Sequence, residues 1–300
     1  MSVPSWMKGS PQSILLATDL SARSDRALDR AVLLAKQWGS HLTVLHVLDD
    51  QHSPLDLGEP APSWRRPPDP SRAVRKSITS ELSAISDAAS VLIEEGPVVE
   101  TIMRVANSEA SDLIVIGVAR SALLDELMLG RTVDGLLRRS SMPVLVVKNR
   151  ARRRYRHIVV ATDFSESSRH ALVAAMRIFP DQALTIFHAY DTPMSGPMSD
   201  ATSYRREYRK IAEQDLSVFL SETEKLYSAG QHPRVLIEYG APNNLLHDYV
   251  ADKEADLVVV GTHGGSAIFD IFIGSMAKRI LNGVPCDVLV VREPRARAEA

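Results

Sequence analysis

An internal repeat constrains the fold of this 300-residue chain more than any other feature. Four segments of the first half return in the second at one offset of 144 residues: LLATDLS at 15–21 as VVATDFS at 159–165, VLIEEG at 91–96 as VLIEYG at 235–240, DLIVIG at 112–117 as DLVVVG at 256–261, and VLVV at 144–147 again at 288–291. Self-similarity at one offset along a whole chain predicts two copies of one domain, which we place at 1–150 and 151–300.

Each copy alternates short apolar runs with amphipathic stretches, the pattern of a parallel sheet covered by helices. In the second copy the pattern predicts strands over 157–162, 183–189, 234–238, 256–261 and 288–291, and helices after Ser165, over 201–228, over 242–254 and from 274–275. Along the longest helix, Tyr204, Tyr208, Ile211, Phe219 and Leu226 fall mostly at three- or four-residue spacing, which predicts a core-facing stripe. The sequence therefore predicts an α/β fold in both halves.

Composition and charge exclude several classes of protein. The chain is 45% hydrophobic and 24% charged with a net charge of −2, which is typical of a globular protein and argues against a nucleic-acid or membrane-surface role. The arginine-rich segment 149–156 is accordingly interpreted as a charged linker. Cys286 has no partner cysteine, so we expect a buried structural thiol and a reducing compartment. The sequence shows no secretory signal and no apolar run of ~20 residues, so we expect a cytoplasmic protein.

A glycine pattern in the second copy indicates a site for phosphates. The apolar run 257–260 ends on Gly261, Gly264 follows, and Gly274-Ser275 comes after nine further residues, at the start of a predicted helix. Glycines after a strand let backbone approach a ligand, and a helix N-terminus offers unpaired N–H groups and a positive dipole end. The Gly-Lys-Ser/Thr ending of a Walker A loop is missing, so no lysine from that motif reaches the phosphates.

The chain resembles a tandem universal stress protein on these residues, over roughly 12–149 and 155–293. The nucleotide signature of that family is Gly, two residues, Gly, nine residues, then Gly-Ser or Gly-Thr, which the second copy matches at every position. The resemblance implies two Rossmann-like (HUP-type) α/β/α domains, each with a five-stranded parallel sheet of order 3-2-1-4-5. Ligands of such sheets bind at the carboxyl ends of the strands where the order reverses, so Asp163 and Gly261 would meet in one crevice.

The resemblance also implies an ATP site in the second copy, with a residue set that follows the family's motif. The nucleoside would meet Ala161, Thr162 and Asp163, the adenine would meet the backbone of Ala189, and the ribose and phosphates would lie among Val260, Gly261, His263, Gly264, Gly274, Ser275, Met276 and Ala277. Mg²⁺ would be held through phosphate oxygens and waters rather than by a protein cage.

The first copy departs from the signature. Gly117 and Gly130 remain, but Arg120 stands at the second glycine and Arg131 at the serine. Arg120 could fill the space of a phosphate, or supply a cation to a modified site or to the neighbouring copy. We favour a degenerate first site, because losing the glycine removes the close backbone approach. Asp19 survives, which leaves some nucleotide binding there open.

Two residues of the second copy have structural alternatives. Asp163 could be a helix N-cap, although Ser165 could serve instead. His263 could be a zinc ligand or a catalytic group, but no histidine has the spacing of a known metal motif, so contact with the nucleotide is favoured.

Three function classes follow. The first is an ATP-binding stress regulator with an unknown protein partner and at most slow hydrolysis, since no general base or P-loop lysine is evident. The second is an enzyme, a weak ATPase or a nucleotidyl transferase, and the third is a scaffold without nucleotide. Members of the family commonly pair through their fifth strands, so 144–147 and 288–291 would form an intrachain pseudo-dimer. A homodimer of two chains stays open.

Overall fold

The computed structural model describes residues 9–21, 24–48, 88–118, 130–191, 201–223, 233–262 and 274–293, and its strands form one sheet of ten. The strands are β1 Ser13–Thr18, β2 His41–Leu48, β3 Ala89–Glu95, β4 Leu113–Gly117, β5 Val144–Val147, β6 His157–Ala161, β7 Ala183–Tyr190, β8 Arg234–Tyr239, β9 Leu257–Gly261 and β10 Asp287–Val291. The helices are α1 Ser24–Trp38, α3 Val98–Ser108, α4 Arg131–Arg139, α5 Glu166–Ile178, α6 Ala201–Thr223, α7 Pro242–Asp252 and α8 Ser275–Gly283.

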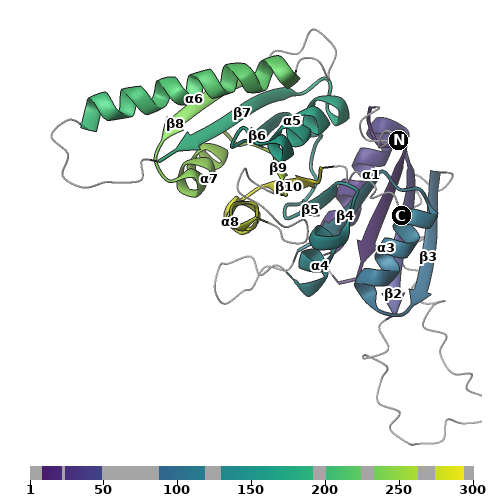
Figure 1. Cartoon of the computed structure of the whole chain (residues 1–300). Helices are drawn as coiled ribbons and strands as arrows, with labels where there is room; N and C mark the ends of the chain where they lie inside the picture. Colours follow the sequence, from purple (N-terminus) through teal and green to yellow (C-terminus); the bar gives the residue numbers. More distant parts are fainter. Residues whose placement is uncertain are drawn as a thin grey trace, which may run out of the picture.

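The sheet order confirms the topology expected for each half. The strands lie in the order β3-β2-β1-β4-β5-β10-β9-β6-β7-β8, so both the first repeat (β1 to β5) and the second repeat (β6 to β10) have the order 3-2-1-4-5 (Figure 1). Within each repeat every pairing is parallel. The predicted strands of the second repeat agree with the observed bounds to within one residue.

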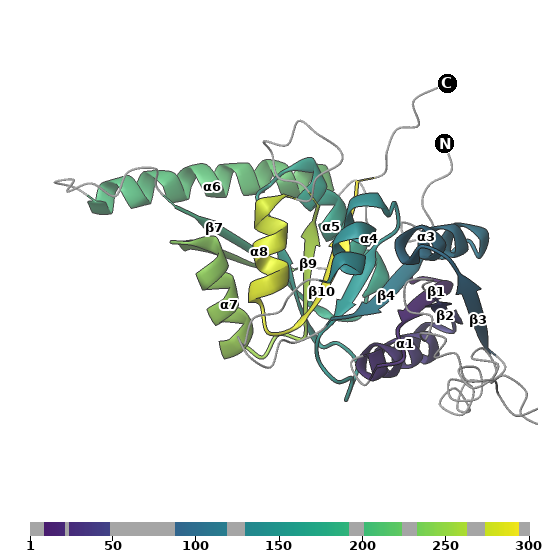
Figure 2. The same ribbon diagram turned by 90° about the horizontal axis from the view of Figure 1, so that it is seen from below.

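Helices cover both faces of the sheet, and each face has a core that runs through both repeats. Side chains of α1, α5 and α6 pack in one apolar cluster, and those of α3, α4, α7 and α8 in another. Figure 2 shows α7, α8, α4 and α3 along the second of these faces. Central strands such as β5 and β9 are buried on both faces, which explains their unbroken runs of branched residues.

The expected inward stripe of α6 is partly wrong. Phe219 is 2% exposed as predicted and Tyr208 is half-buried, but Ile211 is 46% exposed. The side chain of Tyr204 and the whole of Leu226 lie outside what the structure describes. Ala212 and Leu216, rather than Ile211, pack toward the core beside Phe219. Because the sequence around Ile211 is mostly polar, its spacing is compatible with more than one buried face of the helix. Packing against the sheet decides which face is buried.

The two repeats join through their fifth strands. β10 pairs antiparallel with β5, and the register places Leu289 opposite Leu145 (Figure 1). These two leucines are equivalent positions of the repeat, so a pseudo-twofold axis passes between them, as in an isologous dimer. The predicted intrachain pseudo-dimer is confirmed, and the pairing removes two exposed sheet edges.

A buried carboxylate fastens the linker between the repeats to the second repeat. Asp287 stands where the first repeat has Pro143, and it is 1% exposed. Its Oδ1 accepts the backbone N–H of Lys148 at 2.9 Å, and its Oδ2 accepts the hydroxyl of Tyr155 at 2.7 Å. The Arg30 guanidinium of α1 lies 3.3 Å from Oδ2 and 4.0 Å from the centre of the Tyr155 ring. Burial and the neighbouring Asp287 raise the pKa of Tyr155 well above its ordinary value, so the phenol stays a hydrogen-bond donor.

The one cysteine of the chain is buried beside this carboxylate. Cys286 is 3% exposed, and burial raises the pKa of its thiol to about 12. It therefore stays a protonated thiol at neutral pH, as expected for a structural cysteine. Among the described helices, none combines the length and hydropathy that a bilayer crossing requires.

Replacing Asp287 with alanine should destabilise the whole molecule. Breaking a buried ion pair costs about 3–5 kcal/mol, so the melting temperature should fall by about 5–10 °C. Asp248→Ala is the matched control, because Asp248 is exposed on α7 and should change the melting temperature by about 1 °C or less. Scanning calorimetry measures both; equal melting temperatures for the two variants would contradict the assigned role of Asp287.

Candidate functional site

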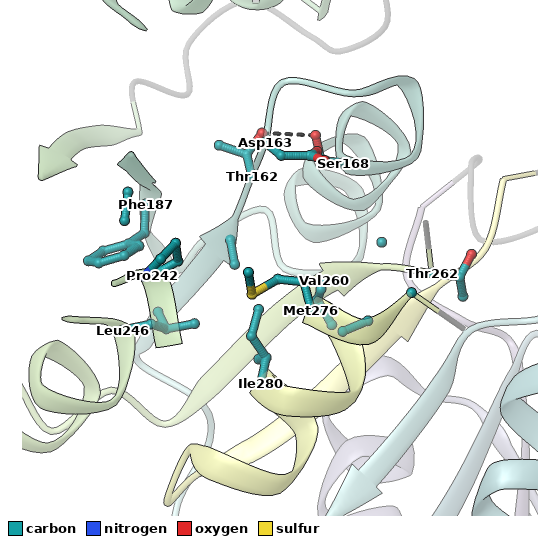
Figure 3. Close-up of a pocket in the computed structure, with 15 residues that line it drawn as sticks. Thr162, Asp163, Ser168, Phe187, Pro242, Leu246, Val260, Thr262, Met276 and Ile280 are labelled. Carbon is teal, nitrogen blue, oxygen red and sulfur yellow. Dashed lines mark hydrogen bonds between the residues drawn. The ribbon is translucent and has the colours of Figure 1, made fainter. Parts of the chain in front are cut away.

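A pocket of about 190 Å³ opens at the carboxyl ends of β6 and β9, against the first turns of α8 (Figure 3). These are strands one and four of the second repeat, the pair at which the strand order reverses and at which doubly wound sheets bind ligands. The pocket is lined by Ala161, Thr162, Asp163, Ser168, Phe187, Ala189, Pro242, Leu246, Val260, Gly261, Thr262, Gly274, Met276, Ala277 and Ile280.

Nine of the twelve residues predicted for the nucleotide site line this pocket. They are Ala161, Thr162, Asp163, Ala189, Val260, Gly261, Gly274, Met276 and Ala277. Ser275 is the first residue of α8 and does not line the pocket. His263 and Gly264 lie outside the described residues, so their predicted contacts stay predictions.

The sequence analysis did not predict six of the residues that line the pocket, and only some of these six could have been identified from the sequence pattern. Phe187 lies two residues before Ala189 in β7, and Ile280 lies one helical turn after Met276, so side-chain periodicity could have found both. Pro242 and Leu246 belong to α7, whose approach to the pocket depends on tertiary packing. Their contribution could not be read from local sequence.

The pocket is mainly apolar with polar groups at one side. Phe187, Leu246, Val260 and Ile280 supply aromatic and branched surface. In Figure 3, Thr162, Asp163 and Ser168 lie together above this apolar floor. Apolar walls with few polar groups are typical of small-molecule sites, and such walls suit the flat face of a heterocyclic base.

A strained turn presents Asp163 at the end of β6. Phe164 has a left-handed φ of 63°, uncommon for a residue with a side chain. The Thr162 hydroxyl accepts the Phe164 N–H at 2.9 Å, and the Phe164 ring stacks on His188 with centroids 4.1 Å apart. Ser165 caps α5 by accepting the N–H of Ser168, so the N-cap alternative for Asp163 is not needed. Local contacts therefore hold the turn, and Asp163 is exposed at the pocket mouth.

His188 ties β7 to the same turn. Its Nδ1 lies 2.9 Å from the Thr162 carbonyl oxygen, so Nδ1 carries the proton and donates. Burial lowers the pKa of His188, and this outweighs the hydrogen bond to Thr162 and the charges of Asp163 and Asp215, which raise it. The imidazole is therefore neutral at physiological pH and supports the turn as a hydrogen-bond donor.

The first repeat builds the same turn but uses its carboxylate differently. The Ser24 hydroxyl donates to Asp19 Oδ1 at 2.6 Å, whereas its equivalent, Ser168, bonds Thr162 Oγ1 at 2.9 Å. Burial raises the pKa of Asp19, but hydrogen bonds from Ser21 and Ser24 outweigh it and hold the pKa below its ordinary value. In both repeats the carboxylate accepts the backbone N–H two residues further along, from Ser21 at 3.0 Å and from Ser165 at 3.1 Å. In the first repeat it also accepts the hydroxyls of Ser21 and Ser24.

The N-terminus of α8 supplies hydrogen-bond donors next to the pocket. Gly274 is the N-cap, and no side chain caps the helix. The Gly274 N–H donates to the Thr262 carbonyl at 2.8 Å, which brings the end of β9 and the start of α8 together. The first N–H groups of a helix lack intrahelical partners and, with the helix dipole, favour an anion. Within the described residues, no cluster of His, Cys, Asp and Glu could hold a metal ion.

Close packing between β9 and α5 requires glycine at position 261, a constraint that the sequence alone did not reveal. A Cβ at this position would lie 2.5 Å from Ser167 Oγ and 2.7 Å from the Ser167 carbonyl oxygen. The backbone of α5 thus passes too close to β9 for any side chain. Gly261 is required by the junction of α5 and β9, apart from any ligand.

Known proteins resemble the chain in sequence and in fold. The family model described as "Universal stress protein family" matches residues 11–148 and 154–292. The chain is 29% identical over 145 residues to "Universal stress protein MJ0531" of Methanocaldococcus jannaschii, a match that covers 47% of this chain and 84% of the relative. It is 30% identical over 151 residues to "Putative universal stress protein SAUSA300_1656" of Staphylococcus aureus, covering 48% and 89% of the two chains.

Two solved structures share the fold over nearly the whole chain. The "functionally unknown protein PA1789" of Pseudomonas aeruginosa has a TM-score of 0.66 at 20% identity, with 96% of this chain and 94% of that one covered. A "Putative Universal Stress Protein" from another strain of that species has a TM-score of 0.64 at 22% identity, covering 95% and 94%. At these sequence identities, the two structures show that the chain shares their fold.

Gly261→Ala should destabilise the second repeat, because the added Cβ meets backbone that cannot rotate away. Overpacking of this kind costs about 1–3 kcal/mol, so the melting temperature should fall by about 2–6 °C. The control is Gly283→Ala in the last turn of α8, where a Cβ meets nothing within 4 Å and should be neutral or stabilising. Thermal unfolding of both variants checks this. A Gly261→Ala protein as stable as the control would show that β9 and α5 can separate.

The lowered pKa of His188 predicts a pH dependence of stability. The unfolded chain takes up the proton near pH 6.5 and the folded chain only at lower pH, so stability falls as the pH drops through this window and is full above it. His188→Gln should therefore reduce the decline in melting temperature between pH 7.5 and 5.5. His247→Gln, at an exposed site on α7, is the control. An unchanged pH profile for His188→Gln would refute the assignment.

Proposed function

The chain belongs to the universal stress protein family, and we propose that it is an ATP-binding regulator in stress response that holds its nucleotide in the second repeat. The observation that carries the proposal is the apolar pocket at the ends of β6 and β9, which shares its rim with the uncapped start of α8. One part of such a site suits a base and the other suits phosphates.

The residues present fit Mg-ATP. The base would lie against Phe187, Leu246 and Ala189, and the ribose would lie near Asp163, whose carboxylate can accept hydroxyl hydrogen bonds. The phosphates would meet the N–H groups at the start of α8. Mg²⁺ would be bound mainly through phosphate oxygens and waters, as is usual for this ion.

Differences in side-chain size support an asymmetric protein with one nucleotide per chain. Val47 stands at the position of Ala189, and Val133 at that of Ala277, so the first repeat has larger side chains where the second has its pocket. The helices that would flank a first site also approach closely, since a Cβ on Gly135 of α4 would lie 2.8 Å from Val99 of α3. These differences add to the loss of the second signature glycine.

The residues that line the pocket favour nucleotide binding over catalysis of phosphoryl transfer. Asp163 is the only ionisable side chain among the described residues that line the pocket. Efficient phosphoryl transfer uses several cations and a positioned base around the γ-phosphate. We therefore propose that occupancy, communicated to a protein partner, is the function, with hydrolysis slow at most.

Making the second repeat resemble the first should weaken nucleotide binding. The double variant Ala189→Val, Ala277→Val should bind Mg-ATP at least about tenfold more weakly, because the added methyl groups fill a small pocket. Val47→Ala in the first repeat is the matched control and should leave the affinity within about twofold of the natural protein. Isothermal titration calorimetry measures affinity and stoichiometry. An affinity unchanged by the double variant would remove the nucleotide from this pocket.

A further inference from the structure

We propose that Asp134 of the first repeat is a positioning residue for the nucleotide site of the second repeat, which it supports by holding helix α8 through Lys278. The inference rests on the proposed function, because it concerns the affinity of that same site. It also gives the first repeat a role that does not depend on binding nucleotide itself.

Helix α8 faces the pocket on one side and the first repeat on another. Met276, Ala277 and Ile280 line the pocket. Lys278 is rotated by about 100° from Ala277 around the helix. Its Nζ lies 3.0 Å from Asp134 Oδ1 on α4, so the ion pair joins the two repeats. In Figure 2, α8 and α4 lie on either side of β10, near the centre of the joined sheet.

The partner of Lys278 is itself held in place. Arg138, one turn further along α4, donates through Nε to Asp134 Oδ2 at 2.7 Å. Burial raises the pKa of Asp134, but the contacts with Lys278 and Arg138 outweigh it and keep the pKa below its ordinary value. The carboxylate is therefore ionised at neutral pH and accepts from both cations.

A second contact from the first repeat holds the other end of α8. Val284, the C-cap residue of α8, accepts a hydrogen bond on its carbonyl oxygen from Lys148 Nζ at 2.7 Å. Lys148 follows β5 and is 2% exposed. A cation at the C-terminus also complements the helix dipole. Contacts from the first repeat thus hold α8 at Lys278, its fourth residue, and at its C-cap, Val284.

The internal repeat shows that this ion pair needs two unlike halves. Asp134 and Lys278 are equivalent positions, 144 residues apart, and they meet beside the pseudo-twofold axis. In a dimer of identical domains such positions face their own copies, so two aspartates or two lysines would repel each other. Opposite charges here favour the pairing of the first repeat with the second, and the lysine lies on the helix of the intact signature.

Holding α8 should raise affinity through pre-organisation. A helix already in its bound position does not have to be ordered when the ligand arrives. The side chains of Asp134 and Lys278 are 32% and 36% exposed, so the contribution is that of a partly solvated ion pair. Such pairs contribute modestly, which corresponds to about a threefold change in affinity.

The test is a double-mutant cycle on the full chain, with the affinity for Mg-ATP measured by calorimetry. Asp134→Asn should weaken binding about threefold, because α8 loses its anchor. Simple charge repulsion predicts the opposite sign, since this variant removes a negative charge near a polyanionic ligand. Lys278→Gln should also weaken binding, and the double variant should bind no more weakly than Lys278→Gln alone.

Two controls separate positioning from general effects. Asp134→Glu keeps the charge and should restore most of the affinity. Glu213→Gln breaks the exposed Arg209–Glu213 pair on α6, 3.0 Å apart, and should leave the affinity unchanged. Melting temperatures of all variants should stay within a few degrees of the natural protein, so that a changed affinity reports on the site.

Each outcome decides the proposal. If Asp134→Asn binds as tightly as the natural protein, or more tightly, the positioning role is refuted and the ATP site stands. An effect of Asp134→Asn that persists in the Lys278→Gln background would also refute it, because Lys278 would not be the route. If the natural protein takes up no Mg-ATP, the proposed function and this inference both fail.

Discussion

The antiparallel pairing of β5 with β10 is the interaction on which the rest of the structure depends. It places Leu145 opposite Leu289, joins two five-stranded sheets into one, and lets both apolar cores run through both repeats. It also brings α4 beside α8, which creates the contact between Asp134 and Lys278. The buried Asp287 holds the linker against this junction, so the two repeats are joined by polar contacts as well as by the sheet.

The two repeats share one fold but differ in the side chains at the position of the pocket. The second repeat has alanines at 189 and 277 and an apolar pocket, whereas the first has valines at both equivalent positions. Asp19 in the first repeat accepts the hydroxyls of Ser21 and Ser24, while Asp163 accepts the backbone N–H of Ser165 and lines the mouth of the pocket. On our proposal, the second repeat binds the nucleotide and the first repeat holds the helix that the nucleotide meets.

Much of the fold, and the place of the pocket, could be predicted from the sequence because both depend on repeated local patterns. The repeat offset predicted the two halves, and the family resemblance predicted the strand order and the approach of Asp163 to Gly261. The rest depends on packing between distant segments. The contribution of Leu246 to the pocket and the exposure of Ile211 follow from how helices lie on the sheet, which no local pattern encodes.

The nucleotide's place in one repeat is the central claim, and a crystal structure determined with Mg²⁺ and a non-hydrolysable ATP analogue tests it most directly. We predict one nucleotide per chain, with its base against Phe187 and Leu246 and its phosphates at the N-terminus of α8. The first repeat should hold none. A nucleotide seated at Asp19 in the first repeat, or a second repeat without one at saturating concentration, would contradict the assignment.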